Sequence, residues 1–344
     1  MQRPHLRDLT LPELESWAEA QGLPRYRAAQ LFTWVHRSGL TSTEGMTNLS
    51  KELRARLAEQ CDLSGLAVDA VLTSEDGTRK LRLRCADGQA VEAVLIPAED
   101  KLTLCISTQA GCALGCRFCA TATMGLRRNL SAGEIVDQVY RAQSLLVGDE
   151  RLTNLVYMGM GEPLANLADV LRSVEILGTE AGASFSPRRI TISTAGLVPG
   201  IAELGRRVPG IGLAISLHAT TDELRSQLMP INRRWPLAEL LRVVREFPLP
   251  RRRRVTFEYL LLRGLNDAPA DAKRLVRLLD GIPAKVNLLA YNPCRTDQPD
   301  LQRPDEGTVE EFAELLREKG LNATVRRSRG LDIAAACGQL ALQG

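Results

Sequence analysis

Six short runs of β-branched and aliphatic residues alternate with amphipathic segments after Lys101, and this alternation constrains the fold more than any other feature. The segments between the runs, such as "SAGEIVDQVYRAQSLL" and "DAKRLVRLLDG", carry apolar residues at helical spacing. Strands that alternate with helices form parallel sheets. The sequence therefore predicts an α/β fold, a partial (βα)6 barrel of the TIM type. The runs are "LTLCIST", "LTNLVYMG", "RRITISTAG", "IGLAISLHA", "RVTFEYLLL" and "KVNLLAYNP".

Two smaller regions precede this barrel. Residues 1–65 have apolar residues at three- and four-residue spacing, with Thr10 and Ser50 placed as helix N-caps, and this pattern predicts a small helical domain. Residues 66–100 alternate apolar and polar side chains and are broken by Asp76-Gly77 and Asp87-Gly88, which predicts a β-hairpin or meander. Residues 101–344 would then form the barrel and a C-terminal segment.

Composition places the chain among ordinary globular proteins. Of its 344 residues 44% are hydrophobic and 25% are charged, which suits one large domain with a smaller companion. The first residues are charged without an apolar core, and no later run reaches membrane-spanning length, so we expect a cytoplasmic protein with no membrane contact.

Charge is informative only locally, because the net charge is a mild +3. Three arginine-rich runs stand out at Arg251–Arg254, at Arg326–Arg329 and at Arg127-Arg128. Each run alone would suit a solvated face. Together they are expected to flank one site, which indicates an anionic polymer.

Three of the eight cysteines form the motif Cys112-x3-Cys116-x2-Cys119, and Cys105 stands just upstream. A structural zinc site usually presents four ligands as two separated pairs, and the sequence contains no second pair. Three thiolates from one loop suit a 4Fe-4S cluster, which is left with one iron free for a substrate. The scattered cysteines are expected to be small buried thiols; they are Cys61, Cys85 and Cys294.

Active sites of βα folds gather at the carboxyl ends of the strands. The chemically distinctive residues of this sequence follow the predicted strands at those ends. They are Cys105 and the cysteine motif, then Gly159 to Pro163, Ser193, Ser216 to His218, and Asn292.

The cysteine motif, with Phe118 before its last cysteine, resembles that of the radical S-adenosylmethionine enzymes, in which the cosubstrate chelates the open iron. Further segments resemble the RlmN/Cfr family of RNA adenine methyltransferases, and the resemblance covers nearly the whole chain. The closing segment "ACGQL", which contains Cys337, is the most specific of these segments, because the wider superfamily does not require a cysteine there. The others are "GCALGCRFCATATMGLRRNLSAGEIVDQV", "YMGMGEPLAN", "ISTAG", "ISLHA", "YNP" and "RRSRGLDIAAACGQL".

The resemblance implies a reaction that uses two S-adenosylmethionine molecules per turnover. Cys337 would take a methyl group from the first, and the 5'-deoxyadenosyl radical formed from the second would abstract hydrogen from that methyl. The resulting radical would add to adenine and tether RNA to the protein. Cys105 would then attack the sulfur of Cys337, form a transient disulfide and release the methylated RNA. Glu92 matches the family's proton acceptor, although its alternating run also suits a solvent-facing carboxylate.

Other positions match the family's cosubstrate contacts. Gly161 and Glu162 would meet the amino end of S-adenosylmethionine. His218 by itself would suit a core histidine, and its place in "ISLHA" assigns it to this set. The remaining matches are Ser193, Ser216, Leu217 and Asn292.

The resemblance thus implies a methyltransferase of the EC 2.1.1 class that methylates C2 of an adenosine in 23S ribosomal RNA and in tRNA near the anticodon. It implies an electron donor such as flavodoxin or ferredoxin, and a monomer suffices. A C8 methyltransferase of 23S ribosomal RNA is the alternative within the family, and C2 is expected as the commoner housekeeping activity. A non-catalytic, metal-bearing RNA-binding module is the alternative from another class. Such a module has no use for Cys105 and Cys337 outside the metal loop.

Overall fold

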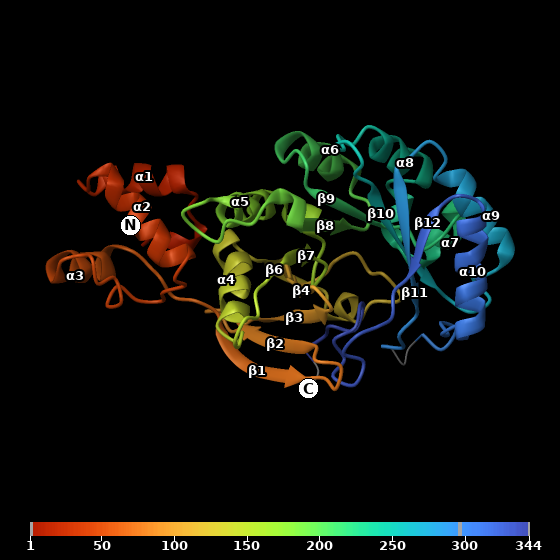
Figure 1. Ribbon diagram of the computed structural model, residues 1–344, viewed down its shortest axis with the longest axis horizontal. Helices are drawn as coiled ribbons and strands as arrows, with labels where there is room; N and C mark the ends of the chain where they lie inside the picture. The colour runs from red at the N-terminus through yellow and green to blue at the C-terminus, as the bar shows by residue number, and fades with distance from the viewer. Residues whose placement is uncertain (1–2, 295–297, 343–344) are drawn as a thin grey trace.

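The computed structural model describes residues 3–294 and 298–342. Its main feature is a curved sheet, ten-stranded within these residues, in the order β1-β2-β3-β4-β7-β8-β9-β10-β11-β12 (Figure 1). All six predicted runs are parallel neighbours in it, and β12, which was not predicted, joins the parallel side. The parallel strands are β4 (Lys101–Cys105), β7 (Asn154–Tyr157), β8 (Ile190–Thr194), β9 (Gly212–Ser216), β10 (Val255–Leu261), β11 (Ala284–Ala290) and β12 (Asn322–Val325).

Amphipathic helices follow these strands and pack against the sheet, as the alternating pattern predicts. They are α4 (Ala132–Gln143), α5 (Leu167–Gly178), α6 (Val198–Arg207), α7 (Asp222–Leu228), α8 (Leu237–Arg245), α9 (Pro269–Leu278) and α10 (Glu306–Glu318). Short 3₁₀ helices complete the loops at η2 (Ala120–Met124), η3 (Pro163–Asn166), η4 (Pro187–Arg189) and η5 (Pro230–Arg233). Across the described residues, the structure contains no helix that is both long and apolar enough to span a bilayer.

The antiparallel strands β1 (Ala67–Thr73), β2 (Arg79–Arg84) and β3 (Ala90–Ala98) are joined by the two predicted Asp-Gly turns. Gly77 and Gly88 have φ of +82° and +83° there, the left-handed conformation that glycine adopts without strain. Strand β3 also pairs antiparallel with β4, from Val94 with Cys105 to Ala98 with Lys101. The β1–β3 extension is therefore continuous with the barrel sheet.

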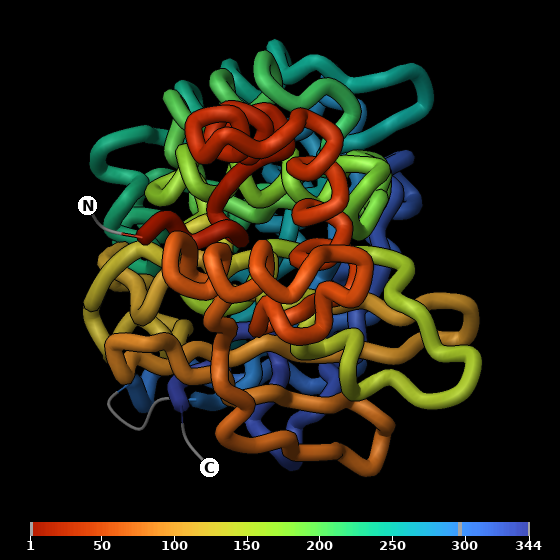
Figure 2. Tube along the Cα trace, turned by 90° about the vertical axis from the view of Figure 1, so that its left-hand side faces the viewer, coloured from red at the N-terminus to blue at the C-terminus, as the bar shows by residue number. Residues whose placement is uncertain are grey.

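The N-terminal helices α1 (Leu11–Ala20), α2 (Arg25–His36) and α3 (Lys51–Gln60) follow the short η1 (Leu6–Asp8). Thr10 and Ser50 are N-caps, as predicted. A buried ion pair between Arg7 and Asp137 and a 2.8 Å hydrogen bond between His36 and Tyr140 join this region to α4. Figure 2 shows these helices, in red and orange, in front of the rest of the chain.

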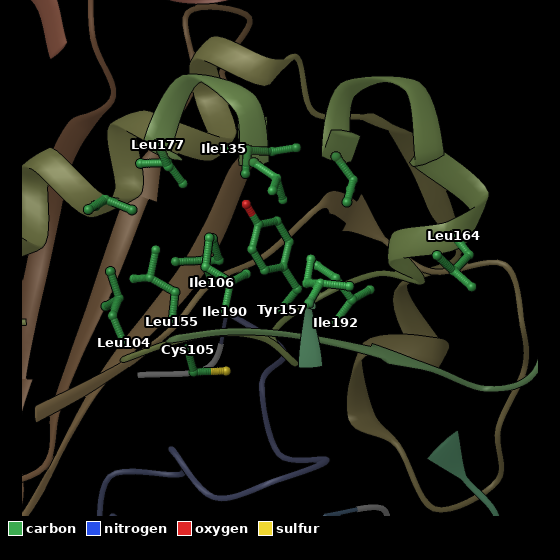
Figure 3. Close-up of a cluster of buried hydrophobic side chains, with 14 of the residues drawn as sticks. Leu104, Cys105, Ile106, Ile135, Leu155, Tyr157, Leu164, Leu177, Ile190 and Ile192 are labelled. Atoms are coloured by element: carbon green, nitrogen blue, oxygen red, sulfur yellow. The ribbon is translucent and has the colours of Figure 1, made fainter. Parts of the chain in front are cut away.

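A hydrophobic core lies between the parallel strands and the helices (Figure 3). Leu104 and Ile106 point into it together with Leu155 and Tyr157, and all four are fully buried. Cys105 lies between Leu104 and Ile106, and its side chain projects from the other face of the strand. Because side chains alternate along a strand, the same residues that bury β4 against the helices direct this sulfur toward the inside of the barrel.

Candidate active site

A cavity opens at the carboxyl ends of the parallel strands. It encloses about 1320 Å³ of space, including the part open to solvent. Ten of the predicted residues line it: Cys105, Cys112, Cys116, Cys119, Gly161, Glu162, Ser193, Ser216, His218 and Cys337. The other three, Glu92, Leu217 and Asn292, are outside this lining.

The cysteine loop is fixed by a small hairpin of β5 (Gln109–Gly111) and β6 (Leu126–Asn129). Gly111 has φ of +78°, and a Cβ there would lie 1.8 Å from the carbonyl oxygen of Gly125, so only glycine is accommodated. The amide of Cys112 donates to that carbonyl at 3.1 Å. The hairpin therefore sets where the thiol-bearing loop begins.

The three loop thiols suit a polynuclear cluster. Burial raises the pKa of Cys112 to about 11 and raises that of Cys116 further, and each thiol is also affected by its neighbours. Among the described residues no three His, Cys, Asp or Glu side chains are placed to hold one metal ion together. A cubane does not need that arrangement, because each of its thiolates binds a different iron. Binding of iron would remove the thiol protons.

Glu162 is a buried carboxylate beside this loop, with 3% of its surface exposed. It accepts hydrogen bonds from the amides of Leu164 at 3.1 Å and Ala195 at 2.8 Å, and burial raises its pKa to about 7. Its neighbour Gly161 has φ of +100°, and a Cβ there would lie 2.6 Å from Cβ of Gln109. The backbone is therefore packed tightly around a carboxylate that suits a cationic ligand group.

His218 is held in one tautomer. Its Nδ1 accepts a 3.0 Å hydrogen bond from the amide of Leu260, which leaves the ring proton on Nε2. Burial, and secondarily the charge of Arg225, lower its pKa to about 3, so the ring stays neutral. Its ring makes a T-shaped contact with the ring of Phe118, with 4.8 Å between the centroids, which places it beside the cysteine loop.

Arg225 connects the ends of two strands. Its guanidinium is fully buried and donates to the carbonyls of Ala195 at 2.7 Å, Ser216 at 3.0 Å and Leu217 at 3.1 Å. Leu217 is fully buried and takes part through its backbone. The loops after β8 and β9 are thereby fixed relative to each other.

Asn292, like Arg225, is buried and joins two segments through hydrogen bonds. It is 4% exposed, and its Oδ1 accepts from Arg303 and from Ser328, each at 2.9 Å. These bonds join the end of β11 to the segment that follows β12. The side chain is thus satisfied by protein groups outside the cavity lining.

Two thiols outside the cysteine loop share the cavity. Burial, and secondarily the proximity of Cys337, raise the pKa of Cys105 to about 12. Cys337 has a solvent-exposed surface, yet the surrounding protein desolvates the thiol and raises its pKa, while Arg326 opposes the shift. All eight cysteines are free thiols, so the two are near each other without a disulfide.

Glu92 is buried, and the solvent-facing interpretation is wrong. With 1% of its side chain exposed, it pairs at 3.1 Å with Lys80, which is 3% exposed. Its other oxygen accepts from the amide of Leu342 at 3.2 Å. The carboxylate therefore contacts the C-terminal segment.

The arginine runs differ in their placement. Arg326 lines the cavity, which its membership in a charged run did not reveal. The run Arg251–Arg254 immediately precedes β10 and so lies at the amino end of that strand, whereas the cavity residue Leu260 is near its carboxyl end. The expectation that every run flanks the site is therefore wrong for Arg251–Arg254. Glu258, buried on β10, also lines the cavity and was missed, because nothing in the pattern of its strand marks it.

Comparison with known proteins gives consistent matches. Residues 5–63 match the ribosomal RNA large subunit methyltransferase N-terminal domain, and residues 106–276 match the radical SAM superfamily. The chain is 51% identical over 349 aligned residues to the dual-specificity RNA methyltransferase RlmN of Anaeromyxobacter dehalogenans, covering 99% of this chain and 92% of the relative. It is 49% identical to the protein of that name from Geotalea uraniireducens, covering 99% and 97%.

A solved structure resembles the whole fold. It is a radical SAM methyltransferase from Sphaerobacter thermophilus, with a TM-score of 0.92 and 48% sequence identity. The alignment covers 98% of this chain and 99% of that one. The partial barrel, the β1–β3 extension and the N-terminal helices thus belong to one shared architecture.

Proposed function

The chain belongs to the RlmN family of dual-specificity RNA methyltransferases, and on this premise we propose that it methylates C2 of an adenosine in 23S ribosomal RNA and in tRNA near the anticodon. It is a radical S-adenosylmethionine enzyme, whose cofactors are S-adenosylmethionine and a 4Fe-4S cluster. The observation that carries the proposal is the shared cavity, in which a three-thiol loop faces two further thiols, Cys105 and Cys337.

The cluster would be held by Cys112, Cys116 and Cys119. When bound, it supplies one-electron chemistry, which suits an electron-poor ring carbon that offers no good nucleophile for polar methyl transfer. Glu162 would accept hydrogen bonds from the amino group of S-adenosylmethionine, and Gly161 lets the backbone come close to it. Ser193, Ser216 and neutral His218 supply further donors and acceptors at the strand ends.

Cys337 would carry the methyl group as a thioether, because this exposed cysteine lines the cavity. Cys105 would resolve the RNA adduct: its thiolate attacks the sulfur of Cys337, a sulfur–sulfur bond forms, and the carbon–sulfur bond to the base breaks. The electron pair of that bond stays with the methylene carbon and the base, and the carbon takes up a proton to become the methyl group. Both thiols are protonated at neutral pH in the resting protein. Each must therefore lose its proton before it reacts.

For two of the three predicted residues outside the cavity lining, we propose roles without direct contact to the bound groups. Leu217 and Asn292 are predicted cosubstrate contacts. Because they lie beside the lining and are hydrogen-bonded at the ends of their strands, we propose that they help binding by fixing the position of those strand ends. Glu92 is a predicted proton acceptor. Its bonds to Lys80 and Leu342 hold the carboxylate beside the C-terminal segment that carries Cys337.

The remaining expectations complete the proposal. Two S-adenosylmethionine molecules are used per turnover, and flavodoxin or ferredoxin supplies the electron. The enzyme acts as a cytoplasmic monomer. Residues 1–65 form an RNA-contacting domain, residues 66–100 a β extension, and residues 101–344 the barrel with its C-terminal segment.

The test is nucleoside mass spectrometry on a 23S ribosomal RNA fragment and on tRNA. Each is incubated anaerobically with the cluster-loaded protein, S-adenosylmethionine and a reductant. We expect 2-methyladenosine in both. Formation of 8-methyladenosine would place the chain in the other branch of the family, and no methyladenosine in either RNA would overturn the proposal.

A further inference from the structure

Four polar residues form a row across neighbouring parallel strands of the barrel. Ser216 on β9 pairs with Glu258 on β10. Glu258 pairs with Asn287 on β11, and Asn287 pairs with Thr324 on β12. Residues paired across parallel strands point to the same face of a sheet, so these side chains lie beside one another. Ser216 and Glu258 line the cavity, which places the row on the inner face of the barrel.

Hydrogen bonds along this row orient the carboxylate of Glu258. The hydroxyl of Thr324 donates to Oδ1 of Asn287 at 2.9 Å. The amide nitrogen Nδ2 of Asn287 then donates to Oε1 of Glu258, also at 2.9 Å. Because Glu258 is only 7% exposed, its carboxylate is held in one orientation at a buried position.

The second oxygen of this carboxylate has no partner in the protein. Oε2 of Glu258 is buried and makes no hydrogen bond to any residue that the structure describes. A buried acceptor without a donor costs free energy, so such groups are uncommon in native proteins. Since Glu258 lines the cavity, a bound group that offers an N–H or O–H would satisfy this oxygen.

Arg326 brings a donor to the same cavity. Its amide donates to the carbonyl of Leu288 at 2.8 Å, which fixes the chain after β12. Its guanidinium makes no hydrogen bond or ion pair within residues 3–294 and 298–342. Burial raises the pKa of Glu258 and the charge of Arg326 opposes that shift, so the two side chains are near each other without pairing.

Both side chains are also neighbours of Cys337. Burial raises the pKa of this thiol, Arg326 lowers it, and Glu258 raises it. In the proposed reaction, C2 of adenine bonds to the methylene carbon on Cys337. C2 is bonded to N1, and N1 is bonded to the carbon that carries the 6-amino group. An adenine that presents C2 to Cys337 therefore presents an acceptor, N1, and a donor, the 6-amino group, along the same edge.

We propose that Glu258 is a specificity-determining residue, whose Oε2 accepts a hydrogen bond from the 6-amino group of the target adenine while Arg326 donates to N1. The inference rests on the proposed function and deepens it. Guanine has an oxygen in place of the 6-amino group and a hydrogen on N1, so both contacts would become repulsive. The two side chains thus select adenine and hold its C2 edge toward Cys337.

The test compares two RNAs that differ only in the 6-amino group. Both are anticodon stem-loops of tRNA; one has adenosine at the target position, and the other has purine riboside, which keeps N1 and the hydrogen on C2. Wild type, Glu258→Gln and Arg326→Gln are compared as cluster-loaded proteins. Glu258→Gln keeps an oxygen for Asn287 and places an NH2 donor at the position of Oε2. Arg326→Gln is the matched control, because N1 is present in both RNAs.

Methylation of C2 is measured by nucleoside mass spectrometry under single-turnover conditions. We expect wild type to methylate adenosine about 10- to 100-fold faster than purine riboside, as for one hydrogen bond to a charged group. Glu258→Gln should lose this preference, whereas Arg326→Gln should be slower on both RNAs and keep it. The inherent difference in reactivity between the two bases is the same in all three proteins, so it cancels when their rate ratios are compared.

Urea unfolding checks that each variant is folded. If Glu258→Gln does not fold, Asn287→Leu takes its place. This variant removes the bond that orients the carboxylate and leaves Glu258 itself unchanged. It should reduce the same preference for adenosine.

S-adenosylmethionine also carries an adenine, and a separate measurement identifies which adenine meets Glu258. Methylation of Cys337 without RNA or reductant requires only the cosubstrate, and the mass of the peptide that contains Cys337 reports it. We expect Glu258→Gln to be no slower than wild type, because loss of the carboxylate favours the thiolate of Cys337. Slower methylation of Cys337 that more S-adenosylmethionine restores would assign Glu258 to the cosubstrate and overturn the inference.

The remaining outcomes are distinguishable. An unchanged preference for adenosine in folded Glu258→Gln would overturn the inference while the proposed function stands. If wild type forms no methyladenosine, the proposed function fails. The difference in affinity between the two RNAs, measured by fluorescence anisotropy, needs no turnover and would still decide whether Glu258 recognises the amine.

Discussion

The amide of Ala120 donates a 2.7 Å hydrogen bond to the carbonyl of Gly338. Ala120 directly follows Cys119, and Gly338 directly follows Cys337, so this bond joins the loop that would hold the cluster to the loop that would carry the methyl group. Gly338 has φ of +84°, and a Cβ there would lie 3.1 Å from the carbonyl of Phe118. The bond brings together two cysteine-bearing segments that are far apart in the sequence.

Replacing Cys337 by alanine should abolish methyladenosine formation, because no sulfur remains to accept the methyl group. The absorbance of the cluster should be unchanged, since Cys337 is not among the proposed ligands. Nucleoside mass spectrometry and visible absorption measure the two effects. Cys85→Ala, at a buried thiol outside the cavity lining, is the control and should keep activity. Loss of the cluster in Cys337→Ala would show that Cys337 is a ligand.

Replacing Cys105 by alanine should trap a covalent adduct of protein and RNA, because nothing then attacks the sulfur of Cys337. Denaturing electrophoresis with labelled RNA detects the adduct. The double variant Cys105→Ala/Cys337→Ala should form none, which identifies the attachment point. Normal release of methylated RNA from Cys105→Ala would exclude a resolving role.

RNA affinity should depend on arginines near the cavity. Arg327 and Arg329 are exposed in the segment that follows Arg326. Arg327→Gln/Arg329→Gln should weaken tRNA binding and reduce the slope of log affinity against log salt by about 2, as expected for two lost phosphate contacts. Arg251→Gln/Arg252→Gln removes the same charge at the amino end of β10 and should leave the slope nearly unchanged. Equal slopes for the two variants would contradict this assignment.

The free energy of unfolding should decrease at acidic pH, and buried His36 should contribute to this decrease. Burial lowers the pKa of His36 to about 3 from the ordinary value of 6.5, so the unfolded chain binds a proton that the folded protein does not. The stabilising contribution is complete above pH 6.5 and is lost progressively as the pH falls toward 3. At pH 5 the loss is about 2 kcal/mol.

Urea unfolding of wild type and of His36→Gln at pH 6.5 and pH 5 gives the loss in free energy of unfolding between the two pH values for each protein. The loss in wild type minus the loss in the variant is the contribution of His36. Buried His218 titrates similarly in both proteins and cancels in the comparison. An identical pH effect in the variant would show that His36 does not contribute.

The parallel sheet and the cysteine loop could be predicted from the sequence, because both are local. Hydrophobic periodicity within about 10–15 residues determines a strand or an amphipathic helix. The Cys112-x3-Cys116-x2-Cys119 spacing places three thiols in one loop without any distant partner. The Asp-Gly turns and the caps at Thr10 and Ser50 were predictable for the same reason.

The environment of Glu92 was decided only by the tertiary structure. An alternating strand does not reveal which face is covered, and the segment that buries Glu92 approaches from 250 residues away in the chain. The same holds for Arg326 and for Arg251–Arg254, whose charged runs look alike in sequence but lie at opposite ends of their strands. Local chemistry thus determined the elements and the cofactor motif, whereas packing between distant segments decided which side chains face the site.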